Sequence, residues 1–159
     1  MKKLRLYIET SVWNFCFADD APEKKDITLK FFEKVKSGDY EIFVSDVVFR
    51  EISKADYEKN QLLLGITNQY NPEILVTNTE AIELSESYIL DGVLQANSID
   101  DAIHTVVATV YKMDALISWN LRHLANLGKM EQINDVNRRH GYSKRLELLT
   151  PMEVSDAEI

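Results

Sequence analysis

The fold is decided first by the stretch Leu4-Arg5-Leu6-Tyr7-Ile8-Glu9-Thr10-Ser11. Residues 4–8 form a short run of apolar and β-forming residues, which predicts a buried strand. Thr10 and Ser11 are good helix-capping residues, so we expect a short helix over residues 10–17. Glu9 stands directly at the end of the strand, where a buried charge requires a partner because desolvating an unpaired carboxylate is costly.

The alternation of apolar strands and helices continues along the chain. Further strands are expected at residues 41–45, 73–76, 115–118 and 147–149, and helices at 26–36, 46–52, 56–68, 79–95, 98 or 100 to 111, and 129–140. This pattern predicts the α/β class, with a central, mostly parallel sheet covered by helices on both faces as a three-layer α/β/α sandwich. No repeat or linker divides the chain, so we expect a single domain over 1–154 and a frayed tail over 155–159.

Composition argues against several classes of protein. No run approaches the ~20 apolar residues that a membrane span needs, and the first residues lack the apolar core of a signal peptide. The formal net charge of -8, from 26 acidic and 18 basic residues, argues against general nucleic-acid binding by bulk charge. Cys16 is the only cysteine, which rules out an internal disulfide and argues against a Cys-based zinc site. We expect a cytoplasmic protein.

Oxygen-bearing side chains stand where predicted strands end or the following helices begin. They are Glu9 after the first strand, Glu51 in the helix after the second, Asp100 and Asp101 at the start of a later helix, and Asn120 after the strand that follows it. The carboxyl ends of the strands gather the ligand site in such sheets, and clustered carboxylates suit a hard cation such as Mg²⁺ or Mn²⁺. Spacing alone nevertheless favours helix caps, turns and solvated positions for all of them except Glu9.

Five motifs run in the order and spacing of a known family. They are Leu6-Tyr7-Ile8-Glu9-Thr10-Ser11-Val12, Val44-Ser45-Asp46-Val47-Val48-Phe49-Arg50-Glu51-Ile52, Asp101-Ala102-Ile103-His104, Leu116-Ile117-Ser118-Trp119-Asn120-Leu121-Arg122-His123-Leu124 and Leu148-Leu149-Thr150-Pro151. Through them the chain resembles the PIN-domain family over nearly its whole length. Each motif alone is short, and the order and spacing of the five together are the more specific signal.

The resemblance implies a PIN-like α/β/α fold and a Mg²⁺- or Mn²⁺-dependent ribonuclease that hydrolyses RNA phosphodiester bonds. Carried over position by position, the catalytic residues would be Glu9, Glu51, Asp101 and Asn120. Glu9 and Asp101 would hold the metal ion, directly or through water. Glu51 would complete the charge and orient the attacking water, and Asn120 would support a second metal ion or a water.

The resemblance also implies substrate contacts and partners. Thr10 or Ser11 would supply a supporting hydroxyl, and Arg122, close behind Asn120, is the best candidate for a phosphate contact. Many small members of the family are VapC-like toxins of toxin–antitoxin pairs, which form homodimers and are blocked by an antitoxin. We therefore expect an RNA substrate, an antitoxin protein and a second copy of this chain as partners, and no membrane.

Two positions depart from the pattern of the family. The first acidic residue is commonly Asp and is Glu9 here, and the fourth is often Asp and is Asn120 here. The pocket would then carry three formal negative charges rather than four, so we expect weaker metal binding and low or absent activity. The alternative is a PIN-fold module that binds RNA or a protein without catalysis. A DNA-directed nuclease is a third interpretation.

Other residues have two interpretations each. Basic residues between 122 and 145 outnumber acidic ones and could follow an RNA backbone, or form a solvated helix face. His104 could orient a carboxylate, but a semi-buried packing role is favoured, and the spacing of the histidines argues against a His-based metal site. Trp13, Phe15 and Phe17 alternate and cannot all face one core, so an exposed ring there would suit a partner helix, although Phe15 is expected in the core.

Overall fold

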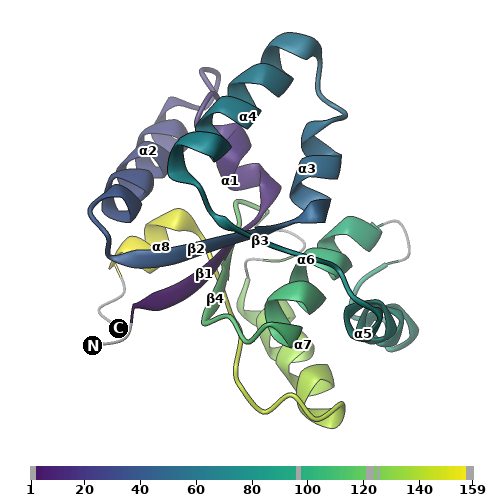
Figure 1. Ribbon diagram of the computed structural model, residues 1–159. Helices are drawn as coiled ribbons and strands as arrows, with labels where there is room; N and C mark the ends of the chain where they lie inside the picture. The colour runs from purple at the N-terminus through teal and green to yellow at the C-terminus, as the bar shows by residue number, and fades with distance from the viewer. Residues whose placement is uncertain (1–2, 96–97, 121–123, 125, 157–159) are drawn as a thin grey trace.

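The computed structural model describes residues 3–95, 98–120, 124 and 126–156. Its centre is a parallel sheet of five strands in the order β3-β2-β1-β4-β5 (Figure 1). The strands are β1 (Leu4–Ile8), β2 (Tyr40–Ser45), β3 (Glu73–Leu75), β4 (Ala115–Ile117) and β5 (Glu147–Leu149). The predicted three-layer α/β/α sandwich is confirmed. Within the described residues, no helix is long and apolar enough to cross a membrane.

Helices cover both faces of the sheet. One layer holds α1 (Thr10–Phe15), α2 (Pro22–Lys36), α4 (Tyr57–Tyr70) and α8 (Pro151–Asp156). The other holds α5 (Thr79–Leu90), α6 (Ile99–Val110) and α7 (Leu127–Arg139). The short helix α3 (Asp46–Ile52) follows β2 and contacts α1, α4 and α6, so it joins the two layers beyond the strand ends (Figure 1).

The direction of the strand order changes between β1 and β4. From β1 the chain moves outward through β2 to β3, and then returns to the other side of β1 for β4 and β5. Ile8 pairs with Ile117, and one residue further on the backbone N–H of Glu9 donates to the carbonyl of Ile117 at 3.0 Å. Such a switch point opens a crevice beyond the carboxyl ends of the strands, where sheets of this class bind ligands.

The core lies on both faces of the central strand. Leu6, Tyr7 and Ile8 are all fully buried, as expected for a strand of a parallel sheet that helices cover on each side. Trp13 is also fully buried, and its ring packs on Phe32 with the ring centres 4.8 Å apart. The rings of Phe15 and Phe17 are only half-buried, and both pack against the edge of the core that contains Trp13.

Several element boundaries differ from the prediction for local reasons. Helix α2 begins at Pro22 rather than Asp26, because proline suits the first turn of a helix. The helix predicted over residues 46–52 is confirmed as α3, and its N-cap is Ser45, whose hydroxyl accepts from Val47 N at 3.2 Å. The Asp46 carboxylate instead accepts two hydrogen bonds from Thr77.

Helix α8 was not predicted. Thr150 Oγ1 accepts from the Glu153 N–H at 3.1 Å and Glu153 Oε1 accepts from the Thr150 N–H at 2.9 Å, which is a reciprocal capping box. Lys34 Nζ then donates to the carbonyl of Ser155 at 2.8 Å and ties α8 to α2. The first two residues of the expected frayed tail therefore belong to a helix, and residues 157–159 lie outside the described part of the chain.

Candidate active site

Glu9 is a buried carboxylate with two hydroxyl partners. Its side chain is nearly covered, and Oε1 accepts hydrogen bonds from Ser11 Oγ at 2.5 Å and Ser118 Oγ at 2.7 Å. Ser118 follows β4, and its hydroxyl also accepts from the Asn120 N–H at 2.9 Å. The partners that a buried charge requires thus come from the next turn of the chain and from the neighbouring strand end.

Glu51 reaches the same place from helix α3. Its Oε1 accepts a hydrogen bond from Thr10 Oγ1 at 2.7 Å and is also hydrogen-bonded to His104 Nε2. The His104 imidazole is fully buried, and its Nδ1 lies 2.6 Å from the Tyr7 hydroxyl. Tyr7 is in turn hydrogen-bonded to Ser45 Oγ at 2.7 Å. A continuous chain of hydrogen bonds therefore joins Glu51 to the ends of β1 and β2.

The charged groups of this hydrogen-bond network stabilise one another. Burial disfavours the charged imidazole, but the hydrogen bond with Glu51 and the nearby charges of Glu9, Glu51 and Asp101 raise the pKa of His104 above its usual value. Burial likewise opposes ionisation of Glu51, but the hydrogen bonds from His104 and Thr10 hold the pKa of its carboxyl below the usual value. Both shifts favour an ion pair. The pKa of Tyr7 is raised well above its usual value by burial, so its hydroxyl keeps its proton.

Asp101 and Asn120 lie next to each other beside the group of Glu9, Glu51 and His104, which we call the acid cluster. Asn120 Nδ2 is 3.4 Å from both carboxylate oxygens of Asp101, and the charge of Asp101 acts on His104 one helical turn further along α6. Glu9 and Asp101 therefore both act electrostatically on the same imidazole, although Asp101 is not one of the three residues, Glu9, Glu51 and His104, whose ligand atoms lie within 4.8 Å of one another. Asp100 belongs to a different group, because its carboxylate forms ion pairs with Arg50 and, at 3.9 Å, with Lys54.

The donor atoms of the cluster suit a hard divalent cation. Ligand atoms of Glu9, Glu51 and His104 all lie within 4.8 Å of one another. His104 Nε2 is already engaged by Glu51, whereas the Oε2 atoms of Glu9 and Glu51 accept no hydrogen bond within the described part of the chain. Carboxylate oxygens rather than the imidazole nitrogen are thus left to ligate, and an all-oxygen donor set favours Mg²⁺ or Mn²⁺ over Zn²⁺.

Sequence reasoning underestimated His104 and missed its partners. The ring is not semi-buried but completely enclosed, and it forms hydrogen bonds through both nitrogens. A signal for this was present, because a histidine three residues after Asp101 in an apolar helix lies on the same side of that helix. Nothing in the sequence pointed to Tyr7 or Ser45, which look like ordinary strand residues.

Two basic residues of the last third of the chain, Lys144 and Arg145, lie away from this site. Lys144 Nζ forms an ion pair at 2.9 Å with Asp114, which directly precedes β4, and Arg145 binds Glu147 at the start of β5. Both therefore lie at the amino ends of the strands, at the edge of the sheet opposite to Glu9. Arg122, the predicted phosphate contact, lies outside the described residues.

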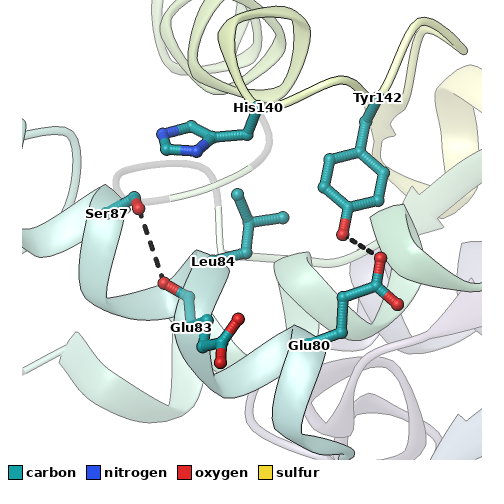
Figure 2. Close-up of a pocket in the computed structure, with 6 residues that line it drawn as sticks. All are labelled: Glu80, Glu83, Leu84, Ser87, His140 and Tyr142. Atoms are coloured by element: carbon teal, nitrogen blue, oxygen red, sulfur yellow. Dashed lines mark hydrogen bonds between the residues drawn. The ribbon is translucent and has the colours of Figure 1, made fainter.

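A separate hollow of about 170 Å³ lies between α5 and the turn after α7 (Figure 2). Glu80, Glu83 and His140 line it, and Tyr142 donates a hydrogen bond to Glu80. Burial and the Glu80 carboxylate raise the pKa of Tyr142 to about 12, so this donor keeps its proton. Among the described residues, only the Glu9, Glu51 and His104 group brings three or more ligand atoms within reach of one metal ion, so this hollow is not a second metal centre.

Comparison with known proteins supports the fold. No family model and no curated protein sequence matches the chain. It is similar to a chain in the crystal structure of VapBC2 from Rickettsia felis bound to a DNA fragment from their promoter, with 17% identity, a TM-score of 0.57 and coverage of 92% of this chain and 98% of that one. It is also similar to a chain of DNA-bound VapBC from Salmonella typhimurium, with 13% identity, a TM-score of 0.56 and coverage of 93% and 98%. The strand order, the acid cluster at the switch point and this similarity together identify the fold of the chain as the PIN-like α/β/α fold of VapBC structures.

Proposed function

We propose that this protein is a metal-dependent endoribonuclease of the PIN-domain type and the toxin of a toxin–antitoxin pair. The observation that carries the proposal is the convergence of Glu9 and Glu51 on His104, with their ligand atoms within 4.8 Å of one another, at the carboxyl ends of β1 and β4. The charge of Asp101 acts on the same imidazole. A protonated His104 offsets only part of the negative charge of these three carboxylates, and a bound cation would offset the rest.

Glu9 and Asp101 are the residues that would hold Mg²⁺ or Mn²⁺. Such an ion lowers the pKa of bound water and stabilises negative charge on a phosphate. Ser11 and Ser118 fix the Glu9 carboxylate through its Oε1 and leave Oε2 directed to the cluster. The Glu9 side chain is one methylene longer than the Asp that is usual in the family, and these two hydroxyls hold its position despite that length.

Glu51 completes the negative charge and orients the attacking water. Thr10 and His104 both bind its Oε1, so its Oε2 is the atom left to accept a proton from water. Water adds to the phosphorus, the phosphodiester P–O bond breaks, and the leaving oxygen takes up a proton. Thr10, predicted to supply a hydroxyl to the substrate, thus acts on Glu51 in this proposal, while Ser11 acts on Glu9.

RNA, an antitoxin and a second copy of the chain are the proposed partners. The similar chains belong to VapBC structures, which supports an antitoxin partner for this chain as well. The alternative function is a PIN-fold module that binds RNA or protein without catalysis. It is favoured by Asn120, whose amide contributes no charge beside Asp101.

Replacement of one acidic residue at a time tests the proposal against its alternative. Asp101→Asn should abolish Mn²⁺-dependent cleavage of single-stranded RNA and leave the fold intact. Asp100→Asn is the matched control, because Asp100 is the adjacent carboxylate and is paired with Arg50 instead. It should cleave RNA as the wild type does. A wild-type protein that cuts no RNA in Mn²⁺, or an Asp101→Asn variant that binds Mn²⁺ unchanged, would overturn the catalytic proposal. Preferential cleavage of DNA would identify the third interpretation instead.

A further inference from the structure

The hollow between the end of α1 and the start of α2 has no role in the chemistry described above. Its volume is about 420 Å³, and it is lined by Phe15, Ala21, Pro22, Glu23 and Lys24. That volume is within the range of small-molecule sites in proteins. Its lining is mostly apolar, with one aromatic ring, one carboxylate and one ammonium group among the side chains.

Lys24 stands over two aromatic rings at this hollow. Its Nζ is 5.5 Å from the centre of the Phe15 ring and 5.4 Å from that of Trp119, and these two rings pack with their centres 5.8 Å apart. Within the part of the chain that the structure describes, no carboxylate forms an ion pair with Lys24. In a chain of net charge -8 this ammonium group is therefore available to an anionic ligand.

Hydrogen bonds and helix α1 connect the surroundings of the hollow to the acid cluster. The backbone N–H of Trp119 donates to Ser11 Oγ at 2.9 Å, and the Ser11 hydroxyl donates to Glu9. Thr10, which binds Glu51, opens helix α1, and Phe15 ends it. Five helical steps of ~1.5 Å place these two residues about 7.5 Å apart along the helix axis.

We propose that this hollow binds one nucleotide of a single-stranded RNA next to the phosphate that is cut. The nucleobase stacks on Phe15, and Lys24 Nζ binds the adjacent phosphate. Bases of every kind stack on exposed aromatic rings, and proteins that bind single strands combine such rings with cationic groups. The inference rests on the proposed function, and an aromatic ring beside an ammonium group favours RNA over an apolar protein segment.

Binding measured without cleavage tests the subsite. The probes are a short oligouridylate and the same oligomer with one base removed, each followed by fluorescence anisotropy in EDTA at low salt. Phe15→Leu should weaken oligouridylate binding about 5- to 100-fold, which is the usual effect of losing one stacked base. It should also remove the preference of the wild type for the intact oligomer. Lys24→Gln should reduce the slope of log K against log [salt] by about 0.7.

Phe17→Leu is the matched control, because Phe17 is also half-buried but does not line the hollow. It should bind the oligomer as the wild type does, and thermal unfolding checks that all three variants are folded. A wild type that does not bind oligouridylate, or Phe15→Leu and Phe17→Leu variants that behave alike, overturns the subsite. If RNA is cut in Mn²⁺ while Phe15→Leu changes nothing, only this inference fails. If Phe15→Leu weakens binding while no RNA is cut, only the proposed ribonuclease function fails.

Discussion

The Tyr7 hydroxyl lies 2.6 Å from His104 Nδ1, so the central strand of the sheet is hydrogen-bonded directly to helix α6 behind the acid cluster. Both side chains are fully buried. Because both groups are enclosed, bulk solvent does not compete for them, and their partners among the described residues are each other, Ser45 and Glu51. The position of the Glu51 carboxylate therefore depends on a residue in the middle of the sheet.

Tyr7→Phe removes the hydroxyl and keeps the ring. It leaves Ser45 Oγ and His104 Nδ1 with one buried hydrogen bond fewer, which should lower the free energy of unfolding by about 1–3 kcal/mol. Urea denaturation of the two proteins measures this difference. Tyr57→Phe is the control, since Tyr57 is 78% exposed, and it should unfold as the wild type does. Equal stability of Tyr7→Phe and wild type would show that the network is not formed in solution.

His104→Gln tests the positioning role of the imidazole. An amide cannot carry the positive charge that stabilises Glu51 or bind both Glu51 and Tyr7 in the same geometry. Loss of a residue that orients a carboxylate of the site should lower the rate of RNA cleavage at saturating Mn²⁺ about 10- to 100-fold. His140→Gln, at the exposed hollow of Figure 2, should leave the rate unchanged. A His104→Gln variant with the full rate and unaltered metal affinity contradicts this role.

The contacts of the Asp114 carboxylate predict how the stability of the protein changes as the pH falls. Partial burial opposes its ionisation, but hydrogen bonds from the Arg5 N–H at 2.8 Å and from Lys144 outweigh burial and lower the pKa of the Asp114 carboxyl. A carboxylate with a lowered folded-state pKa contributes stability that is present above its unfolded pKa of about 3.9 and is lost as the pH falls through the folded value.

Asp114→Asn should therefore melt at a lower temperature than the wild type at pH 7. The two melting temperatures should converge as the pH falls below about 4. Scanning calorimetry across this pH range measures both. The exposed Asp20 offers a control, as Asp20→Asn should melt at the same temperature as the wild type at pH 7. If the difference in melting temperature between Asp114→Asn and the wild type stays constant as the pH falls below about 4, the charge of Asp114 is not its cause.

The capping box at the start of α8 is testable with two changes at one position. Glu153→Ala removes the carboxylate that accepts the Thr150 N–H and should cost about 1 kcal/mol of unfolding free energy. Glu153→Gln keeps an acceptor of the same length and should lose much less. Chemical denaturation compares the three proteins. Equal losses for both variants would show that the charge of Glu153, and not the hydrogen bond, stabilises the helix.

Local signals in the sequence were sufficient for most of the fold. The apolar run at 4–8 and the capping residues Thr10 and Ser11 predicted β1 and α1, because each depends on residues near in the chain. The capping box of Thr150 and Glu153 is equally local and was readable, but it was overlooked.

The site could be predicted only in part. That Glu9 and Glu51 lie close together was predictable, because both follow strands whose carboxyl ends meet at one edge of the sheet. The hydrogen bonds that link Glu51 through His104 to Tyr7 could not be predicted from the sequence. Tyr7 and His104 are 97 positions apart and come together only in the folded protein. The ion pair of Lys144 with Asp114 is another long-range contact, and it removes a charge that sequence composition had made available to RNA.

The most direct test of the account is the anomalous difference map of a crystal soaked in Mn²⁺. We predict a peak beside Glu9 Oε2 and the Asp101 carboxylate in the wild type, and loss of that peak in Asp101→Asn but not in Asp100→Asn. A wild-type crystal that shows no peak among these carboxylates, or a peak that survives in Asp101→Asn, would contradict the claim that Glu9 and Asp101 together bind a metal ion.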